Sequence, residues 1–428
     1  MKNIIPPIKG TRDFYPEDMS IRTWLYSKLR EVSNLYGYQE YEGPILEAID
    51  LYAAKSGEEL VKEQSFVFPD RSGDLITLRP ELTPTLARMV AQRQKQLVYP
   101  LRWWSFGPFW RYERPQKGRT REFFQWNIDL IGANAPEADA EMIAIIATFF
   151  QTVGLSSEQV KILINDRTLI ESELNRIDIP DNQYKSVFKL VDRKEKMPGP
   201  EWRAYAKEIG LSERNIDDLE ALLTDSSLWK KSANLSRVFS ALDALKVSKY
   251  TKFDPNIIRG LDYYTSTVFE AKENQGDIRR SILGGGRYDN LLADVGGDPL
   301  PAVGFAMGDV IITLLLKANN CLPQDINRLP ADVLVTIFDK QYVLTSLTFA
   351  AEMRQARINT LCHPIADSLG KQLKYASRLG VKLAVIIGPD EIHNSEISIK
   401  DLTSGAQLTV ARKDAISQIQ SLLENEPA

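Results

Sequence analysis

Cysteine and histidine are scarce in this chain of 428 residues, and their scarcity excludes several kinds of chemistry. Two cysteines, Cys321 and Cys362, provide neither a disulfide framework nor a metal cluster, and they fit a reducing compartment. The two histidines, His363 and His393, lie near the C-terminus, far from most of the polar motifs. We therefore expect no Ser/His/Asp triad, no Cys/His pair and no metal site.

Long apolar runs are also missing. No stretch of about 18 apolar residues is available to span a bilayer, so no membrane role is expected. The first residues, MKNIIPPIKGTRD, carry prolines where a signal peptide needs an apolar segment, which predicts a cytoplasmic protein. The net charge of −4 does not exclude nucleic acid as a partner, because binding depends on where positive charge is placed.

The chain is too long for one ordinary core, and its patterns divide it into regions. Residues 17–36 place apolar side chains on one stripe of a helix that ends before Gly37. Residues 168–250 are lysine-rich and helical, which is typical of an inserted segment. From about residue 331 strands alternate with helices, which predicts a separate α/β domain.

Strand signals also occur between the insertion and that domain. They return at residues 255–271 and again around LGGGRYD, residues 283–289. The glycine triplet predicts a turn, although glycines also allow a ligand to approach the backbone closely.

Residues 99–132 predict two strands joined by the basic loop 114–122. Strand parity gives the second strand an apolar face and a hydrogen-bonding face. Arg111 and Glu113 share one face of the partner strand. This arrangement favours a small ligand that carries phosphates, and the alternative is a solvated hairpin with surface ion pairs. The residues on the hydrogen-bonding face are Phe123, Gln125, Asn127, Asp129 and Ile131.

A second polar motif is RGLDYY, residues 259–264. An arginine among tyrosines and one aspartate is consistent with a ligand site and equally with a structural ion pair. The spacing alone leaves both interpretations open.

Together these motifs resemble one family. Arg111, Glu113 and the loop to Phe123 are similar to motif 2 of class II aminoacyl-tRNA synthetases, and RPQKGRTREFFQ is typical of histidyl-tRNA synthetases. Other segments resemble that family in the same order, and the C-terminal segment resembles its anticodon-binding domain. They are KGTRDFYPED (9–18), LRPELT (78–83), RGLDYYTSTVFEA (259–271), GGGRYD (284–289), GFAMG (304–308) and LGKQLKYASRLGVKLAVIIG (369–388).

The resemblance implies an α+β class II synthetase core over residues 1–325, with an antiparallel sheet flanked by helices. It implies a helical insertion at about 168–250 and an α/β anticodon-binding domain at 331–428. Motif 1, here the helix 17–36 and the strand leading to Pro44, would supply a homodimer interface.

The implied function is that of a histidine-tRNA ligase, which uses ATP with Mg²⁺ to activate L-histidine and then charges tRNA(His). The substrate's own carboxylate attacks the α-phosphorus, so catalysis rests on positioning and charge stabilisation. Arg259 would be catalytic, neutralising the α-phosphate. ATP would be held by Arg111, Glu113, Arg119, Arg121 and Phe123. Histidine would be held by Glu81, Thr83, Arg111, Gln125, Asp129, Tyr263 and Tyr264.

One position departs from the class pattern. Motif 3 usually ends in an arginine that grips the γ-phosphate of ATP, and Ile311 stands at that position here. Two rival functions remain open, and only the second of them would explain the missing arginine. One is a regulatory subunit of ATP phosphoribosyltransferase, which shares the core but lacks the anticodon domain, and the other is a tRNA-sensing module without catalysis.

Overall fold

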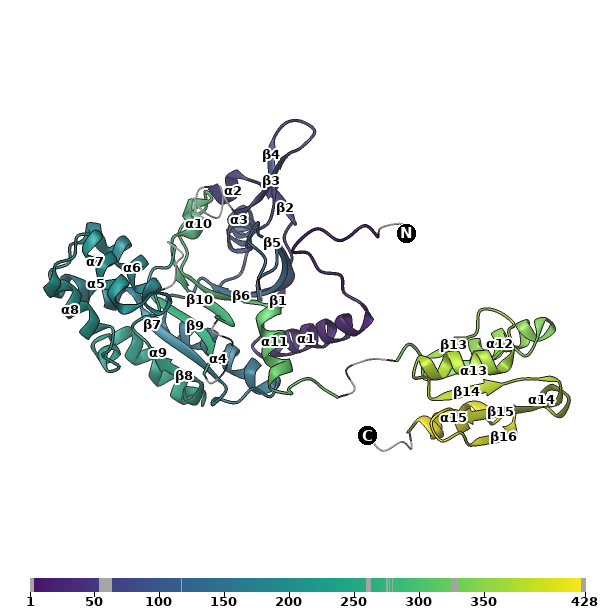
Figure 1. The fold of residues 1–428 in the computed structure, drawn as a ribbon. Helices are drawn as coiled ribbons and strands as arrows, with labels where there is room; N and C mark the ends of the chain where they lie inside the picture. The colour runs from purple at the N-terminus through teal and green to yellow at the C-terminus, as the bar shows by residue number, and fades with distance from the viewer. Residues whose placement is uncertain are drawn as a thin grey trace. The chain divides into compact units, whose positions relative to one another are not determined.

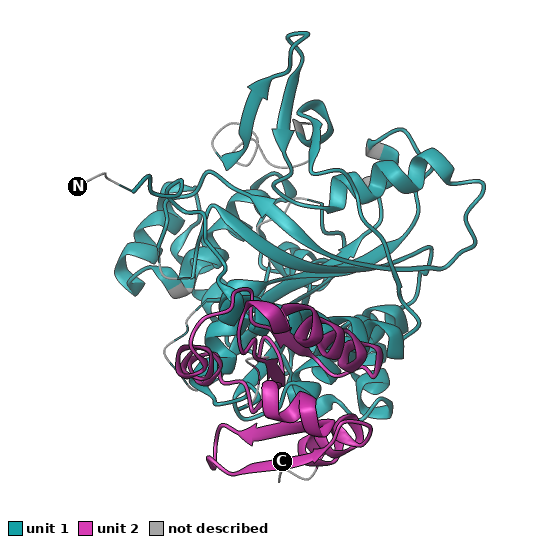
Figure 2. Ribbon diagram, turned by 90° about the vertical axis from the view of Figure 1, so that its right-hand side faces the viewer, with its two compact units in different colours: residues 1–324 teal, residues 325–428 magenta. Residues whose placement is uncertain are grey.

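The computed structural model describes residues 4–53, 64–116, 118–258, 263–274, 276, 278, 280–324, 326 and 329–424. The chain forms two compact units, residues 1–324 and residues 325–428 (Figure 2). Each unit has hydrophobic clusters of its own, so each has a separate core.

An eight-stranded sheet lies at the centre of the first unit (Figure 1). Its strand order is β1-β5-β6-β11-β10-β9-β7-β8. The inner pairs are antiparallel, while β1 and β8 run parallel to their neighbours β5 and β7 at the two edges. This confirms the antiparallel sheet and adds a parallel strand at each edge. The strands are β1 (Gln39–Glu40), β5 (Leu101–Trp110), β6 (Glu122–Ile131), β7 (Val160–Asp166), β8 (Thr251–Phe253), β9 (Thr267–Glu273), β10 (Leu283–Tyr288) and β11 (Ala302–Gly308).

One face of this sheet is covered by helices. The predicted amphipathic helix is α1 (Pro16–Leu35), and it buries Leu25, Leu29 and Val32. The chain leaves α1 through Gly37 in the left-handed region at φ +75°, as a C-terminal glycine predicts. Helix α4 (Pro136–Thr152) is apolar on most sides because α1, α9 (Ala233–Ala244) and the sheet surround it. Helix α11 (Asp309–Ala318) packs against β6 on the same core.

The alternation of β6 sorts its side chains as parity predicts. Trp126, Ile128 and Leu130 are buried in the helix-covered core. The opposite face carries the polar residues, and beside it lie α3 (Thr83–Arg93) and its apolar contacts. The three-stranded sheet β2-β4-β3, built from β2 (Leu46–Ala48), β4 (Leu75–Leu78) and β3 (Phe66–Pro69), leads into α3.

Residues 168–250, all of which are described, contain helices and no strands. This confirms that the segment is helical. Its helices share one continuous core with α4 and the sheet, since Leu235, Val238 and Leu242 of α9 belong to the main cluster. The remaining helices of the segment are α5 (Arg167–Arg176), α6 (Tyr184–Arg193), α7 (Gly199–Glu208) and α8 (Glu213–Leu222).

Two local predictions were wrong. The glycine triplet of LGGGRYD is not a turn but part of β10, a fully buried strand between β9 and β11. Glycine signals a turn only where the chain is free to bend, and here neighbouring backbones need close approach. The strand predicted at 255–271 is also shorter, because in the described residues it begins at Thr267.

The second unit has a five-stranded sheet in the order β13-β12-β14-β15-β16. Its first part follows the prediction, with β12 (Val333–Val335), α12 (Val343–Gln355), α13 (Leu369–Arg378) and β14 (Leu383–Ile386). Strand β13 (Thr360–Cys362) and β14 run parallel to β12, whereas β15 (Glu396–Asp401) and β16 (Gln407–Ala411) complete the sheet as antiparallel strands. The unit is thus an α/β domain, with α14 (Pro389–Asn394) and α15 (Ala415–Glu424) as its last helices.

Candidate functional site

A polar cavity of about 460 Å³ opens on the face of the large sheet that faces α3. Strand β6 provides its floor through Gln125, Asn127 and Asp129, because these alternate residues point away from the helix-covered core. Most of the residues expected to bind substrates meet here although the sequence separates them widely. The expected residues on its wall are Glu81, Thr83, Arg111, Glu113, Arg119, Gln125, Asp129, Tyr263 and Tyr264.

Asp129 lies at the deep end of the cavity and is only 5% exposed. Its Oδ1 accepts a hydrogen bond of 2.5 Å from the hydroxyl of Tyr288 on β10. Burial raises the pKa of Asp129 to about 7, and the bond from Tyr288 opposes that shift only in part. Asp129 can therefore exchange a proton near neutral pH, and it can offer either a carboxylate acceptor or an acidic donor to a ligand.

The loop between β5 and β6 carries the basic residues. Strand β5 ends at Trp110, so Arg111 and Glu113 lie in the loop and not on a strand face as predicted. Arg111 is nevertheless fixed, because its Nε donates to the carbonyl of Pro80 at 2.9 Å and its guanidinium lies 5.4 Å from the ring centre of Phe123. Arg119 forms an ion pair of 3.1 Å with Glu113. A short bridge between Gln116 and Arg119 folds the loop back on itself.

Two of the expected residues, Arg121 and Phe123, do not line the cavity. The guanidinium of Arg121 lies 4.0 Å from the ring centre of Tyr112, and its Nε donates to the carbonyl of Glu113. Phe123 stacks on Phe109 at 5.9 Å between ring centres. Arg259 lies outside the described residues.

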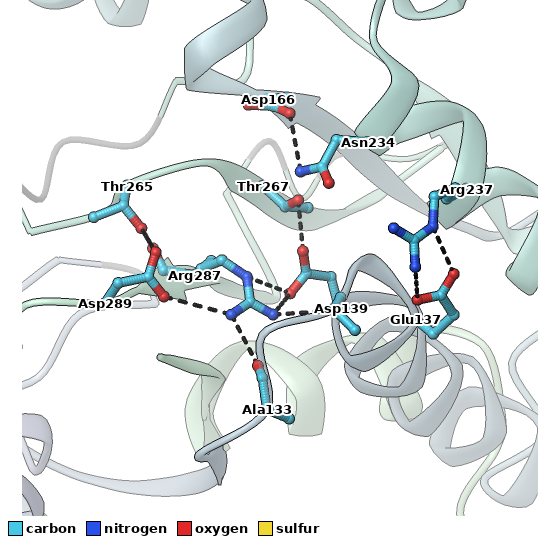
Figure 3. Close-up of polar contacts among 11 residues, drawn as sticks. Ala133, Glu137, Asp139, Asp166, Asn234, Arg237, Thr265, Thr267, Arg287 and Asp289 are labelled. Atoms are coloured by element: carbon cyan, nitrogen blue, oxygen red, sulfur yellow. Dashed lines mark hydrogen bonds and ion pairs between the residues drawn. The ribbon is translucent and has the colours of Figure 1, made fainter. Parts of the chain in front are cut away.

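A buried polar network supports the cavity from the other side of β10 (Figure 3). Because alternate residues of a strand point to opposite faces, Tyr288 lines the cavity while Arg287 turns away from it. Arg287 donates to Oδ1 of Asp139 through Nε at 3.0 Å and through Nη2 at 2.5 Å. Thr267 donates to the other oxygen of Asp139 at 2.7 Å. The arginine of GGGRYD is thus a structural residue that joins β10 to the start of α4.

Sequence reasoning missed several parts of this site. The sequence predicts no role for Tyr288, which lies in a glycine-rich motif, and it places Asn127 on a polar face without assigning it a ligand. Arg79 of LRPELT is completely buried, with its Nε donating to the carbonyl of Pro108 at 2.9 Å and its Nη1 donating to Glu42. Strand parity had indicated Asn127, but no local pattern identifies the partners of Tyr288 and Arg79.

Among the described residues, no group of three or more His, Cys, Asp or Glu side chains could hold a metal ion.

The fold and the cavity together indicate the class of protein to which the chain belongs. An antiparallel sheet with helices on one face and a polar cavity with motif 2 residues on the other is the core of a class II aminoacyl-tRNA synthetase.

Comparisons with known proteins identify the family within that class. The histidyl-tRNA synthetase family matches residues 10–309, and an anticodon binding domain matches residues 332–422. The chain is 37% identical to the chloroplastic/mitochondrial histidine–tRNA ligase of Arabidopsis thaliana over 96% of this chain and 86% of that protein. It is 35% identical to the histidine–tRNA ligase of Leptospira biflexa over 97% of both.

Solved structures agree with this assignment to the histidyl-tRNA synthetase family. The histidyl-tRNA synthetase of Nostoc sp. PCC 7120 superimposes with a TM-score of 0.79 at 25% identity, over 98% of this chain and 100% of that chain. A Bacillus halodurans protein described as an ATP phosphoribosyltransferase regulatory subunit/histidyl-tRNA synthetase, at 23% identity and a TM-score of 0.72, shares the fold alone. The chain belongs to the histidyl-tRNA synthetase family, and full-length similarity to ligases does not favour the regulatory alternative.

Proposed function

We propose that the protein is a histidine-tRNA ligase, which activates L-histidine with ATP and transfers it to the 3′ end of tRNA(His). The observation that carries this proposal is the single cavity in which Asp129 and its tyrosine partner share a wall with Arg111 and Glu113. A deep hydrogen-bonding end and a basic outer end match an amino acid with a polar ring and a polyphosphate.

The deep end would bind histidine. Asp129 and Gln125 can pair with the imidazole nitrogens, while Tyr263 and Tyr264 form an aromatic wall with their ring centres 4.9 Å apart. Glu81 and Thr83 border the same cavity from the start of α3, where a carboxylate suits the amino group of the substrate. Arg111 would hold the substrate's carboxylate and the α-phosphate.

The outer end would bind ATP through Arg111, Glu113 and Arg119, with Phe123 and Arg121 shaping the loop behind them. Mg²⁺ would enter with the nucleotide, since this ion is usually held by phosphates and one or two carboxylates, and Glu113 is the carboxylate on that wall. The ion would neutralise the departing pyrophosphate.

The protein itself contributes little chemistry to the reaction. The histidine carboxylate attacks the α-phosphorus and pyrophosphate leaves, so the residues must align the two substrates and stabilise negative charge. Arg259 would stabilise the α-phosphate. The ribose hydroxyl of tRNA would then attack the carbonyl carbon of histidyl-adenylate and AMP would leave, with a phosphate oxygen of the adenylate as proton acceptor.

We assign amino-acid activation to residues 1–325, with the helical insertion at about 168–250, and anticodon recognition to residues 331–428. A homodimer in the cytoplasm is proposed on the family pattern. The short edge strand β1 and the exposed side chains of Leu35 (69%) and Leu46 (47%) support an interface through α1 and the adjoining strands. No helix in the described part of the chain is long and apolar enough to cross a membrane.

The test is ATP–pyrophosphate exchange with each amino acid in turn. Histidine alone should support exchange, with discrimination on the order of 10⁴ because other amino acids leave Gln125 and Asp129 unpaired. Arg259→Ala should lower the activation rate by roughly 10² to 10³ with less effect on histidine binding. Comparable exchange with another amino acid would refute the substrate assignment.

A further inference from the structure

The family pattern leaves one phosphate partner unaccounted for in this chain. Ile311 stands where motif 3 usually supplies an arginine, and its side chain is 9% exposed within the main hydrophobic cluster. An aliphatic side chain in that position cannot bind phosphate. If the site takes a triphosphate, a cation from another element must reach the same place.

The tip of the loop between β5 and β6 rests on that position. Gly118 has φ +81°, and a Cβ atom added to it would lie 2.6 Å from Cδ1 of Ile311. The same atom would lie 3.5 Å from Cδ of Arg280. Arg280 comes from the segment between β9 and β10, and this shared approach to Gly118 places it beside Ile311. Its charge also interacts with that of Arg119, which lines the cavity.

The Arg280 side chain is only partly exposed, and within the described residues it has neither a hydrogen bond nor an ion pair. Burial and the nearby charge of Arg119 lower the pKa of Arg280, while Glu113 raises it. Because Glu113 is already paired with Arg119, one positive charge remains uncompensated. Desolvation of an unpaired guanidinium is unfavourable, and a bound anion would offset it.

We propose that Arg280 binds the terminal phosphates of the nucleotide and takes the place of the missing motif 3 arginine. The proposal rests on the proposed function only in naming ATP as the polyphosphate. A guanidinium suits this role because its planar fork can donate to two phosphate oxygens at once. The packing of Gly118 on Ile311 fixes the loop that carries Arg119, so the two arginines can approach the same phosphates from two elements.

The proposal predicts discrimination by phosphate number. Arg280→Ala should weaken the binding of Mg·ATP and of pyrophosphate by roughly 10- to 100-fold, as expected for the loss of one charge-assisted contact. AMP binding should be unchanged because AMP lacks the terminal phosphates. Arg280→Lys should fall between wild type and Arg280→Ala, since lysine keeps the charge but loses the fork.

Calorimetric titrations of the full chain with Mg·ATP, pyrophosphate and AMP test this directly. Arg237→Ala is the matched control, because Arg237 is 59% exposed and pairs on the surface with Glu137. In the exchange assay Arg280→Ala should raise the KM for ATP and leave the KM for histidine and kcat nearly unchanged.

The possible failures are distinguishable. Unchanged ATP binding in Arg280→Ala, or equal losses for ATP and AMP, would overturn the role of Arg280, the second by showing a structural effect. A wild type that binds no ATP would overturn it as well. A wild type that binds ATP without histidine-dependent exchange would refute the proposed function, and the ratio of ATP to AMP affinity would still decide the role of Arg280.

Discussion

Tyr288 and Asp129 are joined by a hydrogen bond of 2.5 Å although they lie on strands that are not neighbours in the sheet. Strand β11 runs between them, and its residue at the level of Asp129 is Gly304. A Cβ atom on Gly304 would collide with the Oδ1 atom that accepts the bond. Gly304, the first glycine of GFAMG, therefore makes room for the side chain of Asp129 at the end of the cavity.

Burial of Asp129 makes the stability of the fold depend on pH. Its pKa is raised from 3.8 to about 7, so the folded state holds the proton more tightly than the unfolded state. The stabilisation is fully present below pH 3.8 and is lost as the pH rises through about 7. Asp129→Asn keeps an oxygen acceptor for Tyr288 and removes the titration. Relative to this variant, the wild type should lose up to about 4 kcal/mol of unfolding free energy between acid and pH 8.

Urea unfolding of the wild type and of Asp129→Asn at several pH values measures that difference. The ionisations that both proteins share cancel in the comparison. A difference that stays constant between pH 5 and pH 8 would show that Asp129 titrates normally.

A side chain at position 118 should weaken ATP binding, because Gly118 lies against Ile311. Gly118→Ala places a methyl group 2.6 Å from Cδ1 of Ile311 and strains a backbone at φ +81°. Either the loop or the end of the Ile311 side chain must shift, and we expect the KM for ATP to rise by roughly tenfold with little change in the KM for histidine. The matched control is Gly73→Ala, at φ +94° with no atom within 4 Å of the added group. Gly73→Ala should lose about as much stability as Gly118→Ala, roughly 1–2 kcal/mol, without a change in the KM for ATP. Equal KM values for ATP in the two variants would contradict this account.

The sequence predicted those features that depend on local periodicity. The stripe of α1 and the two faces of β6 follow from the repeats of helix and strand, and the basic loop follows from its composition. What it did not reveal depends on residues that are distant in the chain. Arg287 meets Asp139, which lies 148 positions earlier, and Arg280 meets Gly118 only through the fold. Likewise, the glycine triplet resembles a turn until its buried neighbours are known.

Arg287 should be essential for stability and not directly for binding. It is buried in an ion pair with Asp139, so Arg287→Ala leaves an unpaired buried carboxylate and should cost roughly 3–5 kcal/mol. Arg237→Ala removes a pair whose side chains are 59% and 51% exposed, and it should cost less than about 1 kcal/mol. Figure 3 shows both pairs. Urea unfolding measures both changes, and similar losses would show that the Asp139 pair is not buried in solution.

Deletion of residues 331–428 should separate the two activities. Each unit has its own core, so the first unit should fold and keep exchange activity. Charging of tRNA should fall by roughly tenfold or more, which corresponds to about 1.4 kcal/mol of lost binding free energy. Circular dichroism confirms folding of the truncated protein. If it folds and charges tRNA normally, anticodon recognition does not belong to the second unit.

Replacing Ile311 by the arginine that motif 3 usually supplies in class II synthetases should not improve ATP binding. Ile311 packs among the main cluster and against the tip of the loop at Gly118, so Ile311→Arg would bury a guanidinium without a partner and cost several kcal/mol. The neighbouring Val310 is partly exposed, and Val310→Arg should be milder in urea unfolding. Arg119→Ala, in contrast, should raise the KM for ATP because Arg119 lines the cavity. The opposite result, an inactive wild type that Ile311→Arg makes active in exchange, would mean that ATP handling had been lost and that the protein senses tRNA without catalysis.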